Sequence, residues 1–195
     1  MFWDILRNAK RARDSGQVSV GATCKETGIQ PISKEEIDTI ARTIGDGPIG
    51  LAHHEPDDGA EAHRCFENAT MKVTRDGGQV MFGWTFHSRL VENIPGPGYL
   101  FAAHHAVWHA PDGRLVDVTP HPDPKHRPLG PDGSILFLVD RNAVPVQTGN
   151  QVAPRPTRFF ARDADPRLLT YVEELNRKEN EACSEIYAQG DEASR

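Results

Sequence analysis

Hydrophobic positions recur at the spacing of an amphipathic helix in three stretches of the chain, residues 2–13, 33–44 and 166–188. The middle stretch has the clearest boundaries. Ser33 followed by Glu36 predicts a capping box, in which each side chain bonds the backbone amide of the other residue. Gly45 is then expected to end this helix. The chain is therefore expected to carry a helix towards each terminus and one just before its central part.

A further helix and several strands are expected in the middle of the chain. The helix runs from about residue 63 to residue 74 and is followed by a turn at Asp76-Gly77-Gly78. Runs rich in aromatic and β-branched residues then predict strands, and a tight turn at residues 110–113 joins two of them into a hairpin. The strands are expected at residues 48–52, 79–87, 99–109, 114–118 and 134–139.

The order of these elements predicts an α+β fold. Helices come first and consecutive strands follow, so we expect an antiparallel sheet with the helix that begins near residue 63 packed on it. The length suits a single domain, residues 1–195, with a core at about 33–140 and helical extensions at 1–32 and 160–190. The proline-rich segment 119–132 is expected to be irregular, either a rigid surface connection or a loop beside a substrate.

Composition narrows the class of protein. The formal net charge of −6 offers no basic field for nucleic acid. The three cysteines are far apart and form no CxxC pair, which favours free thiols in a reducing compartment and a cytoplasmic location. No apolar run approaches the roughly 20 residues of a membrane helix, and the first residues do not have the pattern of a signal peptide. We expect no association with a membrane.

Candidate chemistry centres on Cys65, in the run HRCFEN at residues 63–68. A lone cysteine is ordinarily a small buried apolar residue. At the start of a helix, however, the positive end of the helix dipole favours the thiolate, which is the nucleophilic form. A thiolate also needs a base to accept its proton, and the base needs a third group to orient it. Histidines at 104 and 105 and an aspartate at 117 follow on the predicted hairpin.

Strand alternation allows only one of the two adjacent histidines to face the cysteine. Adjacent residues of a strand point to opposite sides, so only one of His104 and His105 can do so, and we expect it to be His105. Unless a one-residue bulge or a longer loop changes the register, a turn centred on residues 112–113 pairs positions whose numbers sum to about 225. That register puts Asp117 nearer residues 106–109 than level with His105. A hydrogen bond from His105 to Asp117 would then be diagonal across the hairpin.

The pattern C-x-x-N, then H-A-V-W, then a hairpin that returns to D-V-T-P resembles the cysteine hydrolases of the papain-like and transglutaminase-like superfamily. It is also similar to protein N-terminal glutamine amidohydrolases in its Cys-x-x-Asn run and its order of histidine and aspartate. The chain differs from the latter in its doubled histidine and shorter spacing from cysteine to histidine. The resemblance covers about residues 63–120 and implies Cys65 as nucleophile, His105 as base and Asp117 as the orienting residue.

Three further residues are candidates for contact with a substrate or an oxyanion. Asn68 lies one helical turn after Cys65 and either donates to an oxyanion or, as we favour, makes a structural hydrogen bond. His104 is the neighbour of the expected base. Trp108 closes the H-A-V-W run and is either a core residue, the favoured reading, or a platform for substrate.

The sequence thus predicts a cysteine-dependent hydrolase or acyltransferase that acts on an amide, either a glutamine side chain or a peptide bond, through a thioester. Its partner would be a protein, a peptide or a small amide, and no cofactor or metal is expected. Two alternatives stay open. Nine histidines leave room for a metal-dependent hydrolase, and the three residues could instead be coincidental in a non-catalytic binding protein. The metal candidates are His53, His54, His63, Cys65, His104, His105 and His109, with Asp117 or Glu55.

Overall fold

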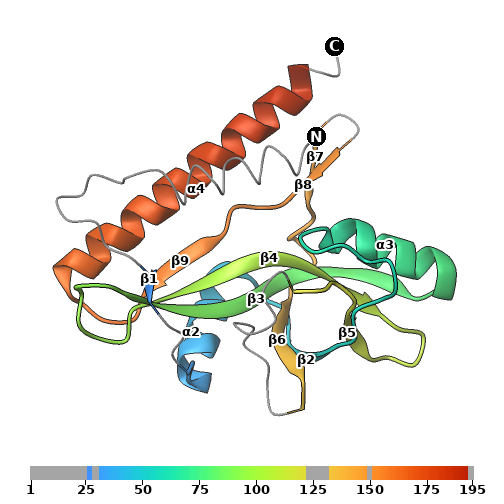
Figure 1. Ribbon diagram of the computed structural model, residues 1–195, viewed down its shortest axis with the longest axis horizontal. Coiled ribbons are helices and arrows are strands. Elements are labelled where there is room, and N and C mark those ends of the chain that lie inside the picture. Colours follow the sequence, from blue (N-terminus) through green and yellow to red (C-terminus); the bar gives the residue numbers. More distant parts are fainter. Residues whose placement is uncertain (1–25, 28–30, 122–131, 149–150, 193–195) are drawn as a thin grey trace. The chain divides into compact units, whose positions relative to one another are not determined.

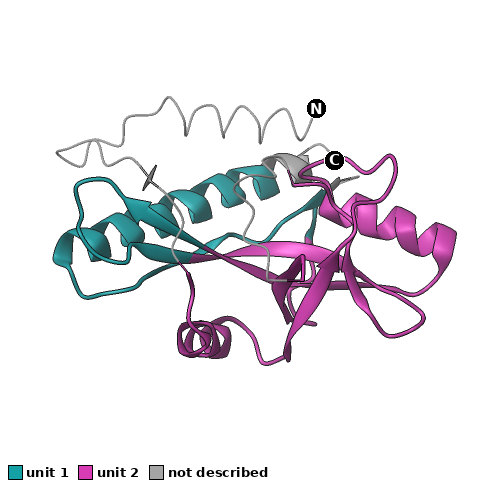
Figure 2. Ribbon diagram, turned by 60° about the horizontal axis from the view of Figure 1, so that its bottom comes forward, with its two compact units in different colours: residues 1–30, 88–100, 146–195 teal, residues 31–87, 101–145 magenta. Residues whose placement is uncertain are grey.

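The computed structural model describes residues 26–27, 31–121, 132–148 and 151–192 (Figure 1). The chain divides into two compact units, and Figure 2 colours them separately. Unit 1 comprises residues 1–30, 88–100 and 146–195, and unit 2 comprises residues 31–87 and 101–145. All residues proposed above for chemistry lie in unit 2. The expectation of a single domain stays a prediction.

Three helices lie in the described residues: α2 (Lys34–Ile44), α3 (Cys65–Asp76) and α4 (Pro166–Glu192). The capping box of α2 is confirmed, since the Ser33 hydroxyl accepts from the Glu36 amide and the Glu36 carboxylate accepts from the Ser33 amide. Gly45 caps the other end of α2 by donating its amide to the Ala41 carbonyl. The helix expected at residues 2–13 lies outside the described residues.

Five strands of unit 2 form a closed ring. They are β2 (Ile49–His54), β3 (Gln79–Val91), β4 (Tyr99–His109), β5 (Leu115–Asp117) and β6 (Ser134–Val139), of which β3 and β4 also extend into unit 1. The order around the ring is β3-β6-β2-β5-β4, and β4 pairs with β3 again. The result is a small barrel with α3 alongside it (Figure 1).

The sheet is mixed, so the expectation of an antiparallel sheet is wrong. β2 pairs with β5 in parallel, with His53 level with Val116 and His54 level with Asp117. The pairings of β2 with β6, of β3 with β6 and of β4 with β5 are antiparallel. The helix α3 and strands β3 and β4 lie between β2 and β5 in the chain, so the connection is long enough for parallel pairing. The coarser prediction, an α+β fold with α3 packed on the sheet, is confirmed.

The barrel has a core on its inner face and a second core under α3. The inner residues alternate along their strands and include Ala52, Val107 and Phe137, all fully buried. On the other face of β4, Ala106 packs against the first two turns of α3. Gly83 of β3 allows the backbones of β3 and β6 to approach closely, because a side chain there would collide with the Leu138 carbonyl.

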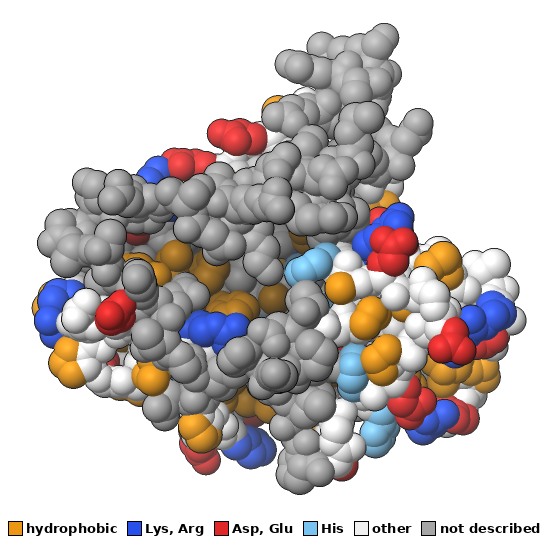
Figure 3. Space-filling model, in the orientation of Figure 1, with side chains coloured by type: hydrophobic (Ala, Val, Ile, Leu, Met, Phe, Trp, Pro, Cys, Tyr) orange, Lys and Arg blue, Asp and Glu red, His pale blue; other side chains and the backbone are white. Residues whose placement is uncertain are grey.

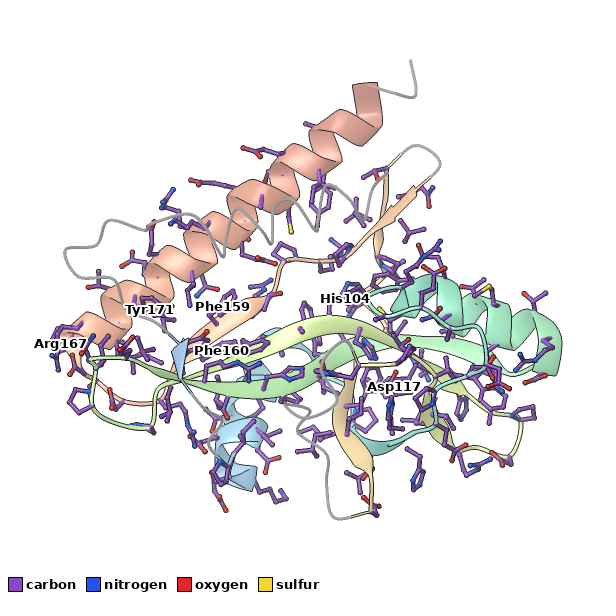
Figure 4. The ribbon with its side chains drawn as sticks, in the orientation of Figure 1. His104, Asp117, Phe159, Phe160, Arg167 and Tyr171 are labelled. Carbon is purple, nitrogen blue, oxygen red and sulfur yellow. The ribbon has the colours of Figure 1, made fainter. Side chains whose placement is uncertain are left out.

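Unit 1 holds α4 and four short strands. The strands are β1 (Glu26–Thr27), β7 (Val146–Thr148), β8 (Gln151–Ala153) and β9 (Arg158–Ala161). Tyr99 packs its ring near the rings of Phe159 and Tyr171, which are labelled in Figure 4. Helical extensions were expected at residues 1–32 and 160–190. Each of these ranges contains strand residues as well, because β1 lies within 1–32 and β9 ends at Ala161. None of the described helices has the length and apolarity needed to cross a membrane.

Candidate active site

Three polar side chains continue the inner face of the barrel at one end. His54 comes two residues after Ala52 on β2, and Asp117 two residues after Leu115 on β5. His105 comes two residues before Val107 on β4. Side chains two apart on a strand share a face. These three polar side chains therefore lie on the inner face of the barrel, next to the apolar core and at the end that the three strands share.

His105 and Asp117 are joined by a hydrogen bond. The distance from His105 Nε2 to Asp117 Oδ1 is 3.0 Å, and the Asp117 side chain is almost entirely buried. The hairpin register pairs Trp108 with Val116 and His109 with Leu115, so Asp117 continues it opposite Val107. His105 is therefore the diagonal neighbour of Asp117, which is one of the arrangements that the turn left open.

Cys65 is the first residue of α3 and also contacts His105. Its side chain is buried beside Phe66, Ala69 and Ala106, and its thiol is hydrogen-bonded to the His105 ring. The Asp117 bond uses Nε2 of the same ring. The imidazole thus lies between a thiol and a carboxylate.

The surroundings of His105 favour its protonated form. Burial lowers the pKa of the imidazole, but the negative charges of Asp117 and Cys65 and the hydrogen bonds from His105 to both residues more than reverse that effect. The net result is a pKa well above the ordinary value of histidine. A histidine in this state holds a proton that it can later give to a leaving group.

The loop from β2 to α3 fixes the position of Cys65. The amides of Glu55 and Asp57 donate to the carbonyls of Asp117 and Val118, so the loop first follows β5. The Asp57 carboxylate then binds Arg75 through two 2.8 Å bonds and Lys72 at 2.9 Å, which together hold its pKa below the ordinary value. Figure 3 shows acidic and basic side chains side by side over the part of the molecule that contains α3.

Asn68 ties α3 to both the loop and the strand that bears Asp117. Its Nδ2 donates to the Glu61 carbonyl at 2.8 Å and to Thr119 Oγ1 at 3.2 Å. The Thr119 amide in turn donates to Asp117 Oδ1 at 3.1 Å. An amide nitrogen has two hydrogens to donate, and both are used here. Asn68 therefore makes the structural hydrogen bonds favoured above, and its side chain has no hydrogen left for an oxyanion.

Replacing Asn68 by alanine should destabilise the protein. The change removes a buried side chain and leaves the Glu61 carbonyl and the Thr119 hydroxyl without their donor. We expect a loss of about 1–3 kcal/mol in the free energy of unfolding, measured by urea denaturation. Met71→Ala, an exposed position on the same helix, is the control and should change stability little. A loss below about 0.5 kcal/mol for Asn68→Ala, within the range of ordinary surface substitutions, would contradict the role of this bridge.

His104 and Trp108 lie on the other face of β4, along α3. His104 donates from Nε2 to the Ala143 carbonyl at 2.6 Å and packs against the rings of Phe66 and Trp84. Figure 4 labels His104 and Asp117 on opposite sides of β4. Trp108 donates from Nε1 to the Gly77 carbonyl at the far end of α3. The hydrogen bonds of His104 and Trp108 thus go to the Ala143 and Gly77 carbonyls.

His54 was considered from sequence only as a metal ligand, and the structure places it beside Asp117. The distance from its Nδ1 to Asp117 Oδ2 is 3.5 Å. The pairing of β2 with β5 brings the two residues level, and that parallel pairing has no local signal in the sequence. Across the described ranges, no group of three or more histidine, cysteine or acidic side chains is arranged to hold a metal ion.

Comparisons of the chain with models of protein families, with curated proteins and with solved structures find no match. The resemblance drawn from residues 63–120 therefore stays a prediction, and the case for any function rests on the geometry of Cys65, His105 and Asp117.

Proposed function

We propose that this protein is a cysteine-dependent hydrolase or acyltransferase that acts on an amide. The observation that carries the proposal is the position of the His105 ring, which bonds Asp117 through Nε2 and is hydrogen-bonded to the Cys65 thiol. A nucleophile, a base within reach of it and a third group that orients the base are the requirements for covalent catalysis.

In the proposed reaction, the Cys65 thiol gives its proton to His105 and the sulfur attacks the carbonyl carbon of the amide. His105 then passes that proton to the nitrogen of the leaving group as the carbon–nitrogen bond breaks. This leaves a thioester on Cys65 and releases ammonia or an amine. Water or a second amine attacks the thioester, gives a proton to His105 and frees the thiol. Asp117 holds the imidazole ring in place and stabilises its charged form.

The first amides of α3 are suited to stabilise the oxyanion of this reaction. The helix begins at Cys65, and no side chain caps it by a hydrogen bond. The backbone amides at the start of a helix point along its axis and carry partial positive charge. A carbonyl oxygen under attack by Cys65 would lie close to the amide of the same residue. This assigns to the backbone the role that Asn68 cannot fill.

Trapping the acyl intermediate tests the proposal. The protein is incubated with glutamine-containing peptides, with and without a fluorescent primary amine, and ammonia release and amine incorporation are followed. Intact-mass spectrometry on quenched samples should find an acyl adduct on Cys65, absent in Cys65→Ala. Ammonia without amine incorporation identifies a hydrolase, and incorporation identifies an acyltransferase. Activity that persists in Cys65→Ala would overturn the proposal, as would activity that a chelator abolishes and zinc restores.

Replacing Asp117 by asparagine should lower the pKa of His105 and reduce turnover. The carboxylate is the largest of the influences that raise the pKa, so its removal leaves the effect of burial, which favours the neutral ring. We expect roughly a tenfold or greater loss of turnover, with the fold and some thiol reactivity retained, because a cysteine–histidine pair can form without the third residue. NMR titration of the ring measures the pKa. An unchanged pKa would show that Asp117 does not act on His105.

A further inference from the structure

Asp117 is approached by a second histidine from the strand opposite His105. His54 ends β2, and its side chain lies on the same face as Asp117 because the two residues are level in the parallel pairing of β2 with β5. The His54 side chain is 14% exposed and that of Asp117 is 5% exposed, so the contact is shielded from solvent. The carboxylate is thus flanked by one imidazole from β2 and one from β4.

The two oxygens of Asp117 have different neighbours. Oδ1 accepts from His105 Nε2 at 3.0 Å and from the Thr119 amide at 3.1 Å. Oδ2 lies 3.5 Å from His54 Nδ1, within ion-pair distance. That nitrogen is buried and makes no hydrogen bond with any part of the chain that the structure describes. A buried polar group without a partner costs about 1–3 kcal/mol, and a small rotation of the ring would let Nδ1 donate to Oδ2.

The other charged groups near the end of β2 have partners elsewhere. Glu55, which follows His54, pairs with Arg114 at 3.3 Å, and both are largely exposed. On the β6 side, Asp132 accepts hydrogen bonds from Ser134, which lower the pKa of its carboxyl. Among the described residues, Asp117 is the charged group within ion-pair distance of His54.

We propose that His54 is a positioning residue of this site: its ring donates from Nδ1 to Oδ2 of Asp117 and so limits how strongly the carboxylate attracts the proton on His105. This inference rests on the proposed function, in which His105 must both take and release a proton. A donor on Oδ2 offsets part of the negative charge that His105 experiences. If His54 is itself protonated, its positive charge also disfavours a positive charge on His105, so it weakens the hold of His105 on its proton in the same way. Two histidines on one carboxylate therefore titrate as a coupled pair.

NMR titration of the histidine rings in the full-length protein tests this role. His54→Leu removes the donor but keeps a side chain of similar shape, and His54→Asn keeps an amide nitrogen where Nδ1 lies. We expect the pKa of His105 to rise in His54→Leu by about 0.5 or more, since part of the charge of Asp117 is no longer offset. In His54→Asn it should return towards the wild-type value. His54→Ala serves as a second donor-free variant if the leucine variant does not fold.

An unchanged or lower His105 pKa in the donor-free variants would overturn the inference, because a residue that only fills space would give that result. A value in His54→Asn equal to that in His54→Leu would overturn the donor role. The titration uses no substrate, so it is independent of the proposed function. If Cys65 forms no acyl adduct while the His105 pKa shifts as expected, the proposed function fails and the role of His54 on Asp117 stands.

Discussion

Replacing Cys65 by serine is expected to lower turnover by at least about 10³-fold while the protein stays folded, because a hydroxyl paired with one histidine is a far weaker nucleophile than a thiolate. The side chain is small and buried beside Phe66, Ala69 and Ala106, so a serine fits the same space. Circular dichroism and urea denaturation check the fold, and release of ammonia or amine measures turnover.

Labelling of the wild-type protein by iodoacetamide at pH 7 tests, without a substrate, whether Cys65 is the reactive thiol. Cys65 and Cys183 are almost equally buried, so exposure alone does not distinguish them. Cys65 contacts a histidine that can accept its proton, whereas Cys183 interacts with Tyr187. We expect Cys65 to be labelled roughly tenfold faster. Preferential labelling of Cys183 in the folded protein would contradict the assignment of the nucleophile. Cys24, the third cysteine, lies outside the described residues.

The parts of the fold that depend on neighbouring residues could be predicted from the sequence. The capping box of Ser33 and Glu36 determines where α2 begins, and Gly45 determines where it ends. The alternation along β4 separates His104 from His105. The short turn at residues 110–113 allowed the register in which His105 is the diagonal neighbour of Asp117, but did not decide it. Each of these signals is contained in a dozen residues or fewer.

The parts that depend on distant pairings could not be predicted. Alternation shows which face of a strand is buried but not which strand is its neighbour, so the parallel pairing of β2 with β5 and the closure of the barrel by β3 and β4 left no local pattern. The contact of His54 with Asp117 follows from that pairing and was missed for the same reason. The strands β7 and β8 were missed because three residues each are too few to show a period.

His105 and His104 are expected to respond in opposite ways to replacement by alanine, although they are adjacent in the chain. His105→Ala removes the base and the proton donor for the leaving group, so turnover should fall by about 10²–10⁴-fold. It also leaves Asp117 without its main ring contact, but the Thr119 amide still bonds the same carboxylate. Iodoacetamide labelling of Cys65 at pH 7 should slow in parallel, because no neighbouring group then accepts the thiol proton.

His104→Ala should act on stability instead. The ring is buried, packs against Phe66 and Trp84 with centroids 5.0 and 5.4 Å away, and bonds the Ala143 carbonyl at 2.6 Å. Its loss leaves a cavity and an unpaired carbonyl, so we expect the free energy of unfolding to fall by about 2–4 kcal/mol. Labelling of Cys65 and turnover, measured well below the unfolding temperature, should stay within about threefold of the wild type, since the His104 ring bonds the Ala143 carbonyl whereas the His105 ring bonds Asp117. The reverse ranking of the two variants would show that His104 is the base, and it would exclude the arrangement of Cys65, His105 and Asp117 as the catalytic one.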